Sequence, residues 1–260
     1  MAINPHMFLW FEELDAKWRI FKGARIADLG PQDLSNTGGL QSVRLRFPDW
    51  TGQDLYRHLG CKTYTSFDLF DSRSVNVDLN DPPSGRPDFD IVTNFGTSEH
   101  VVNQASVFRF MHELTAVNGV MLHSIPAAGG RDHGFFNYHP GFFFDLAAAN
   151  RYEVLNFEYF PHYDLQAPIA TSKVSVDISH RADSQRFTDE AAIKKATFRL
   201  FLRRHVMMIN LRLLISCLRR RNVGPFFDTY RNGDYIHVAL RKTSEGKFEM
   251  PIQKVYQTKS

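Results

Sequence analysis

The chain has 260 residues, enough for one domain with a sizeable core, since 43% are hydrophobic and 23 are phenylalanine. Its two cysteines, Cys61 and Cys217, lie far apart without metal-ligand spacing, so we expect a reducing compartment, no disulfide framework and no zinc or other metal site. The net charge of +3 excludes no class of partner, and acidic side chains soon after the first apolar run argue against a signal peptide.

In the N-terminal half, apolar runs alternate with turn-forming residues. Apolar side chains at helical spacing predict a helix over Phe8–Phe21, and Ala24–Gly30 predicts the first strand. After a loop rich in glycine and polar residues, Thr51–Leu59 predicts a short helix with Thr51 as its N-cap. Three further strands are expected over 62–67, 74–79 and 89–95.

The alternation continues in the C-terminal half. A helix is expected over 104–114, and Asn118-Gly119 predicts a turn into a strand over 120–125 that Pro126 stops. Another helix over 140–150 and strands over 152–160 and 235–241 complete the pattern. Alternating strands and helices predict a doubly wound α/β fold with a mostly parallel seven-stranded sheet and helices on both faces.

The ends of two predicted strands carry the residues typical of a ligand site. Asp28 and Gly30 end the first strand, where a doubly wound sheet holds a nucleotide-like ligand, and Gly30 allows a tight turn and a close approach. The strand over 89–95 ends similarly and is followed by Ser98-Glu99-His100.

The order and spacing of these segments resemble the class I S-adenosylmethionine-dependent methyltransferases. The matching segments are Ile26–Gly30, Ser66–Asp68, Val77–Leu79, Phe89–Asn94, Ser98–Val101 and Asn118–Pro126. The resemblance covers about residues 20–160 and the strand at 235–241. It implies a Rossmann-like fold, one domain over 1–260 with its core over 20–160 and 235–242, and methyl transfer from S-adenosylmethionine to a small molecule, with a sugar or polysaccharide precursor as a candidate acceptor.

The resemblance also implies which residues bind the first part of the cofactor. Asp28, Gly30, Pro31 and Gln32 would line its methionine portion, and Asp68 would accept hydrogen bonds from the ribose hydroxyls. Structural alternatives remain open, because Asp28 can simply cap a turn and Asp68 can belong to a solvated acidic loop.

Further along the chain, the resemblance places the adenine and the acceptor. Asp78 and Leu79 would border the adenine ring, although the nearby Asp81 competes with Asp78 for that role. Asn94 and Phe95 would form the floor between cofactor and acceptor. Glu99 and the following histidine match a pair common in small-molecule members of the family.

One departure from the family concerns the loop after the first strand. Members usually carry Gly-x-Gly there, whereas this chain has Gly30-Pro31-Gln32. A side chain at position 32 narrows the space for a ligand. This leaves two interpretations, cofactor binding through Gln32 or weakened binding in a non-catalytic relative.

Several histidines are candidates for a general base. His100, His133 and His139 follow strand ends or lie on the loop after the fifth strand, and histidine titrates near neutral pH. Each can instead be a packed or capping residue. The aromatic segment 133–140 is a candidate wall of the acceptor site or an ordinary loop that covers the sheet edge.

A basic segment precedes the last strand. Ala191–Phe227 contains nine Lys and Arg residues and no acidic one, and a helical insertion is expected over about 188–224. We favour a structural role for it, with peripheral contact between 194–221 and an anionic membrane as the alternative. The protein is otherwise expected in the cytoplasm, without a nucleic-acid partner, and its oligomeric state is not determined by the sequence.

Two other functions compete with methyl transfer. A nicotinamide-dependent oxidoreductase would use a similar sheet, but Gly-x-Gly-x-x-Gly and a Tyr-x-x-x-Lys pair are missing. A non-catalytic adaptor would keep the fold and engage a membrane surface or a partner protein through the basic segment.

Overall fold

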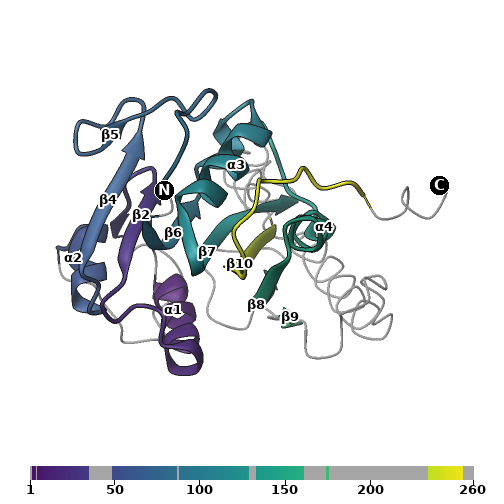
Figure 1. Ribbon diagram of the computed structural model, residues 1–260. Helices are drawn as coiled ribbons and strands as arrows, with labels where there is room; N and C mark the ends of the chain where they lie inside the picture. Colours follow the sequence, from purple (N-terminus) through teal and green to yellow (C-terminus); the bar gives the residue numbers. More distant parts are fainter. Residues whose placement is uncertain are drawn as a thin grey trace, which may run out of the picture.

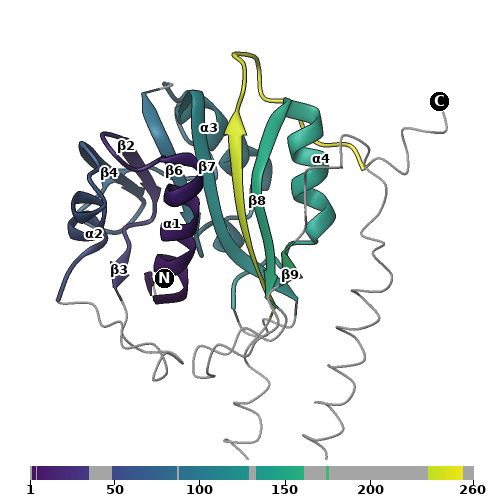
Figure 2. The ribbon, with the colours of Figure 1, turned by 90° about the horizontal axis from the view of Figure 1, so that it is seen from below.

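A central β-sheet with helices on both faces dominates the computed structural model (Figures 1 and 2). The structure describes residues 2–3, 5–34, 49–86, 88–128, 133–160, 174–175 and 234–253. The helices are α1 (Pro5–Trp18), α2 (Gly52–His58), the 3-10 turn η2 (Ser98–His100), α3 (Gln104–Leu114) and α4 (Pro140–Asn150). The strands are β1 (Ala2–Ile3), β2 (Arg25–Leu29), β3 (Asp33–Leu34), β4 (Thr63–Asp68), β5 (Val75–Asn76), β6 (Phe89–Phe95), β7 (Thr115–Ala128), β8 (Tyr152–Phe160), β9 (Val174–Ser175) and β10 (Asp234–Lys242).

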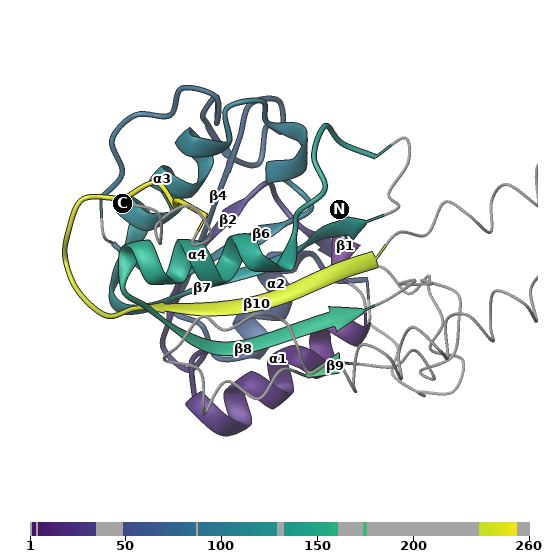
Figure 3. The ribbon, with the colours of Figure 1, turned by 90° about the vertical axis from the view of Figure 1, so that its right-hand side faces the viewer.

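The main sheet has the strand order β5-β4-β2-β6-β7-β10-β8-β9, while β1 and β3 form a separate parallel pair. From β5 to β7 the strands are parallel, and β10 lies antiparallel between β7 and β8 (Figure 3). The predicted seven-stranded, mostly parallel sheet is confirmed, and the two-residue β9 adds a short edge strand. The position of β10 between β7 and β8 differs from the dinucleotide-binding order, in which the strands of each half of the sheet follow one another outward in sequence.

The sheet separates two hydrophobic cores because successive strand residues point to opposite faces. One core contains Trp10, Phe11 and Phe21 from the N-terminal segment, packed on Ile91 and Phe95. The other contains apolar side chains of α3 and α4, packed on alternate residues of the same strands. Both faces are therefore buried, as the apolar strands require.

Several elements agree with the sequence prediction. Strand β6, helices α3 and α4, and strand β8 have the predicted bounds. Helix α2 has the predicted N-cap, because Thr51 and Asp54 form a capping box with reciprocal side chain–backbone hydrogen bonds.

Other boundaries differ for local reasons. Helix α1 ends at Trp18 and not at Phe21, because Arg19 adopts a left-handed backbone conformation with φ of 50°. The strand expected over 74–79 is limited to β5, because its partner β4 ends at Asp68, opposite Asn76.

The largest difference concerns β7. It begins at Thr115, before the predicted Asn118-Gly119 turn, and Pro126 does not stop it. Its parallel partner β6 ends opposite Ser124, so beyond this point a proline on β7 interrupts no hydrogen bonds with β6.

The predicted helical insertion over 188–224 lies outside the described residues, and so do its basic stretch 194–221 and Cys217. None of the helices in the described part of the chain combines the length and apolar character that spanning a bilayer requires.

Candidate functional site

The candidate site begins where the strand order reverses. From β2 the chain continues outward to β4 and β5, then returns to β6 and β7 on the other side, so β2 and β6 are neighbours at the switch point. In open α/β sheets, ligands bind outside the carboxyl ends of the strands at this position. The residues that follow β2 and β6 therefore line the expected site.

Gly30, which follows β2, is at the centre of this switch point. Its φ of +78° lies in the left-handed region, and a Cβ added here would lie 2.8 Å from Oγ1 of Thr97. The Thr97 hydroxyl in turn donates to the carbonyl of Leu29, which joins the ends of β2 and β6. Sequence reasoning missed Thr97, because its importance depends on this contact between strands.

Asp68 lies beside Gly30 at the end of β4. Its Oδ1 accepts hydrogen bonds from the backbone N–H groups of Phe70 and Asp71, at 2.7 and 2.8 Å. Its Oδ2 lies 3.8 Å from the position that a Cβ on Gly30 would take. Among the described residues Oδ2 accepts no hydrogen bond, so this half of the carboxylate is available to a ligand at the switch point.

Gln32 folds inward from the altered loop and is only 2% exposed. Its Nε2 donates to the carbonyls of Gly30 and Phe95, at 3.0 and 3.3 Å, and so ties the loop to the end of β6. Its Oε1 is buried without a hydrogen-bond partner within the described part of the chain. The side chain that replaces the family's second glycine thus offers a buried acceptor.

The first residue of α2 makes room for this loop. Gly52 donates its backbone N–H to the carbonyl of Gln32, at 2.8 Å, and a Cβ on Gly52 would lie only 2.7 Å from that oxygen. Only glycine therefore fits at this position, because a side chain on the first residue of α2 would clash with the backbone of Gln32.

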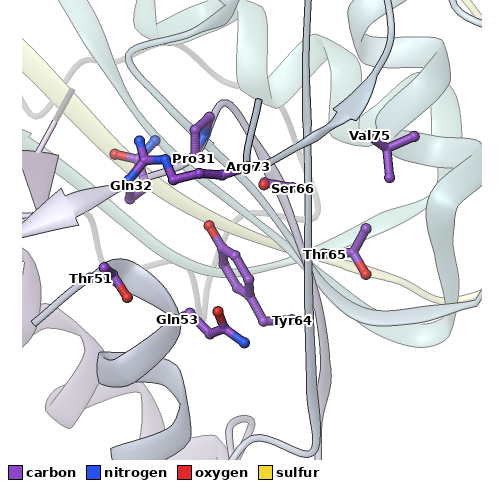
Figure 4. A pocket seen from close by; sticks show the side chains of 9 residues that line it. All are labelled: Pro31, Gln32, Thr51, Gln53, Tyr64, Thr65, Ser66, Arg73 and Val75. Atoms are coloured by element: carbon purple, nitrogen blue, oxygen red, sulfur yellow. The ribbon is translucent and has the colours of Figure 1, made fainter. Parts of the chain in front are cut away.

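A cavity of about 380 Å³ opens next to this loop (Figure 4). Its lining includes two predicted site residues, Pro31 and Gln32, together with Tyr64, Ser66 and Arg73. In Figure 4, the hydroxyl end of Tyr64 points toward Gln32 and the guanidinium of Arg73. The remaining lining residues are Thr51, Gln53, Thr65 and Val75. A mostly polar lining suits a polar ligand.

Asp28 is completely buried and contacts Tyr64, which lines this cavity. Its carboxylate accepts hydrogen bonds from the hydroxyls of Tyr56 and Tyr64, at 3.3 and 2.9 Å, and from that of Thr93. Burial raises its pKa to about 7, and the two tyrosine hydroxyls oppose the rise. The structure thus gives Asp28 a hydrogen-bonding role within the protein, and its contact with the cofactor stays a prediction.

The predicted adenine and floor residues have different surroundings. The carboxylate of Asp78 accepts from the backbone and side-chain N–H groups of Asn80, while the Leu79 side chain packs in the core below α3. The Asn94 side chain is bonded to Ser98, and Phe95 packs against Phe11 on the opposite face. These contacts explain the fold of each segment, and the predicted ligand contacts remain untested.

On the β6 side of the switch point, Glu99 meets two histidines. Glu99 is fully buried, and its Oε1 lies 3.3 Å from Nε2 of His133. The ring centroids of His100 and His133 are 5.0 Å apart. Burial raises the pKa of the Glu99 carboxyl, which His133 opposes, whereas burial and the neighbouring His133 lower the pKa of His100. The structure thus brings together three of the predicted site residues.

The loop that carries His133 is fixed directly on Glu99. The carbonyl of Glu99 accepts from the backbone N–H groups of Phe135 and Phe136, at 2.6 and 3.3 Å. Gly134 has a φ of +68°, and a Cβ there would lie 2.7 Å from Cγ of Glu99. The glycine therefore allows the loop to pack closely enough for His133 to reach the carboxylate.

His139 does not join this cluster. It is the N-cap of α4, where its Nδ1 accepts from the backbone N–H of Gly141 at 3.1 Å. His139 is therefore a capping residue in the structure, which was the alternative interpretation from the sequence. From the same loop, the hydroxyl of Tyr138 instead bonds to Ser98 and Gln104, a buried network that sequence spacing did not indicate.

Comparisons with solved structures complete this description. Neither a family model nor a curated protein sequence matches the chain. A Galdieria sulphuraria protein, provisionally assigned as a sarcosine dimethylglycine methyltransferase, superposes with a TM-score of 0.51 and 12% identity over 92% of this chain and 86% of its own. The chain has the class I methyltransferase fold.

A second methyltransferase structure superposes on this chain with a lower TM-score. The Burkholderia thailandensis 1,6-didemethyltoxoflavin-N1-methyltransferase, crystallised with 1,6-didemethyltoxoflavin and S-adenosylhomocysteine, has a TM-score of 0.47 and 12% identity, covering 92% of this chain and 79% of its own. At such identities the likeness concerns the fold, and the chemistry of the site must be argued from the residues of this chain.

Proposed function

We propose that this protein transfers a methyl group from S-adenosylmethionine to a small molecule that bears a hydroxyl group. The observation that carries the proposal is the pairing of two polar clusters across the β2–β6 switch point. Gly30, Gln32 and Asp68 lie on one side, and Glu99 with His133 on the other. The first cluster suits a cofactor, and the second suits an acceptor.

The first cluster fits the polar groups of the proposed cofactor. The free Oδ2 of Asp68 is an acceptor for a ribose hydroxyl, and the buried Oε1 of Gln32 is an acceptor for the ammonium group of the methionine part. A buried acceptor without a partner costs about 1–3 kcal/mol, which a donor on a ligand would recover. Gln32 in this proposal takes part in binding.

When bound, this cofactor supplies a methyl group on a sulfonium, which is already a strong electrophile. The protein mainly has to align the acceptor and exclude water. With its hydrogen on Nε2 donated to Glu99, His133 keeps Nδ1 free to take the proton of the acceptor hydroxyl. Glu99 orients the imidazole through this contact.

This pair is the reason for favouring a hydroxyl acceptor. An amine that arrives deprotonated needs no base, whereas a hydroxyl loses a proton during the transfer. A sugar or a polysaccharide precursor is an acceptor of this kind and is the class we would test first.

Calorimetric titration with S-adenosylmethionine, S-adenosylhomocysteine and NAD tests the cofactor half of the proposal. We expect binding of the first two and none of NAD. Asp68→Ala should weaken binding at least about tenfold, the loss of a charge-assisted hydrogen bond of about 1.5–3 kcal/mol. Asp88→Ala, at an exposed carboxylate just before β6 and away from the switch point, serves as the matched control.

The result also separates the competing functions. Selective binding of NAD would favour the oxidoreductase. If none of the three compounds binds to the folded protein, the proposal fails and the non-catalytic adaptor becomes the better interpretation. Unchanged affinity in Asp68→Ala would remove the ribose assignment alone.

A further inference from the structure

The cluster of Glu99, His100 and His133 contains the donor set of a transition-metal site. Each residue offers one ligand atom, and these three atoms lie within 4.8 Å of one another. Two imidazoles and one carboxylate form a known set for Zn²⁺ and for non-haem Fe²⁺, with coordination positions left open for water or a substrate. The cysteines led to the expectation of no metal site, but the cysteine count bears only on thiolate ligands and not on this donor set.

A second observation at the same place also indicates a ligand. Oε2 of Glu99 is buried and forms no hydrogen bond within the described part of the chain, although Oε1 of the same carboxylate contacts His133. A buried carboxylate oxygen without a donor is costly. A cation held by both oxygens of the carboxylate would satisfy Oε2, and it would offset the charge that burial disfavours.

The geometry needs only small adjustments. Donor atoms around a tetrahedral zinc ion are ~3.4 Å apart, given bonds of about 2.1 Å. The 3.3 Å separation of Glu99 Oε1 and His133 Nε2 already corresponds to this value. His100 is exposed and His133 is half-exposed, so rotation of their side chains can close the remaining gap.

The backbone holds the carboxylate and the loop histidine together. Glu99 is part of η2, which follows β6, and His133 lies on the segment after β7, the neighbouring parallel strand. The hydrogen bonds from Phe135 and Phe136 to the Glu99 carbonyl fix the loop at this position. Such preorganisation lowers the cost of binding an ion.

We propose that Glu99, His100 and His133 bind one divalent transition-metal ion. Zn²⁺, Fe²⁺, Co²⁺ and Mn²⁺ suit this mixed nitrogen and oxygen set, whereas Mg²⁺ and Ca²⁺ prefer oxygen ligands alone. Metal binding itself does not depend on the proposed methyl transfer. The use of the ion rests on that function: it would lower the pKa of an acceptor hydroxyl bound at the open position, and the proton would pass to solvent water because His133 would then be a ligand.

Titration of the chelator-treated, dialysed full-length protein with Co²⁺ tests the site. Its visible absorption reports the coordination of the ion, and calorimetry with Zn²⁺ gives the affinity. We expect one saturable site that Mg²⁺ and Ca²⁺ do not occupy. Glu99→Gln and His133→Ala should each weaken binding at least about tenfold, since even the loss of an outer-shell partner costs 10–100-fold. His58→Ala, at an exposed histidine on α2, is the control that should bind normally.

Circular dichroism of every variant confirms that a loss of binding is not a loss of fold. The inference is overturned if no saturable Co²⁺ absorption develops, or if both triad variants bind as well as the unaltered protein. S-adenosylhomocysteine affinity measured on the same samples separates the two proposals. Nucleoside binding without metal binding leaves His133 as the general base, and the reverse result removes the methyl-transfer proposal alone.

Discussion

At the level of single residues, Asp28 is the carboxylate whose pKa burial raises to about 7. It accepts hydrogen bonds from two tyrosines and a threonine, yet its pKa rises because the loss of hydration outweighs these hydrogen bonds. Its contribution to stability must therefore depend on pH.

The direction of this dependence follows from proton linkage. Between the unfolded value of 3.8 and the folded value of about 7, the native state binds more protons, so stability is fully present below the lower value and is lost as pH rises through the upper one. Asp28→Asn lacks this term. Relative to Asp28→Asn, the free energy of unfolding of the unaltered protein should fall by up to about 4 kcal/mol between pH 4 and pH 8. Urea unfolding over this range measures the difference.

A difference between the unaltered protein and Asp28→Asn that stays constant with pH would contradict the raised pKa. The hydroxyls of Thr93, Tyr56 and Tyr64 would then have to stabilise the ionised carboxylate more strongly than their geometry indicates.

The residue scale also shows why the site was only partly predictable. Gly30 was predicted because it ends a strand, which is a local property of the sequence, and Gln32 and Asp68 were predicted from the resemblance to the methyltransferases. The inward fold of Gln32 depends on Gly52, and the contact of Glu99 with His133 joins residues on two different strand ends. Such contacts arise only when β6 and β7 are paired.

At the level of elements, a buried lysine fixes the end of helix α3. Lys242, the last residue of β10, is 4% exposed, and its Nζ donates to the carbonyls of His112 and Thr115 at 2.8 and 3.0 Å. These oxygens belong to the group that a helix C-terminus leaves without intrahelical partners. Burial lowers the lysine's pKa, and the helix dipole favours the positive charge at this end.

Lys242→Met keeps the length of the side chain but removes its donors. Two buried carbonyls then lose a partner, so we expect a loss of about 1–3 kcal/mol in the free energy of unfolding. Lys247→Met, at an exposed lysine in the same C-terminal segment, should change it by less than about 0.5 kcal/mol. Denaturant unfolding of both variants makes the comparison, and equal stability would show that water satisfies the two carbonyls.

Elements were predictable where the signal was local. The bounds of α3, α4, β6 and β8 followed from apolar periodicity and turn residues, and the capping box of α2 followed from Thr51. Strand β7 extends beyond both predicted ends, but the predicted Asn118-Gly119 turn is present inside it as a shift of the register with β6 between Phe89 and Ile91. Asn118 takes a left-handed conformation with φ of 68° inside the strand, and Pro126 lies beyond the end of β6.

At the level of the whole molecule, one sheet is shared by two cores. Phe11 is completely buried on the α1 face, and Phe143 of α4 is 1% exposed on the other. Both cores pack on the same strands. Unfolding of one core would therefore disrupt the strands on which the other core packs. We expect the described core to unfold as one cooperative unit.

Phe11→Ala and Phe143→Ala test this expectation from opposite faces. Each should lower the free energy of unfolding by about 3–5 kcal/mol, as for other buried phenylalanines. The transitions followed by far-ultraviolet and near-ultraviolet circular dichroism should coincide in both variants. Two separate transitions in either variant would show that the faces are independent units.

The position of β10 has a consequence for how the protein is made. This strand is synthesised after β7 and β8, yet it lies between them and forms ladders with both. Until β10 has been synthesised, the edges of β7 and β8 that face it lack their partner. Pairing across such a long stretch of sequence is slow, so we expect chaperones to be needed between the synthesis of β8 and the docking of β10.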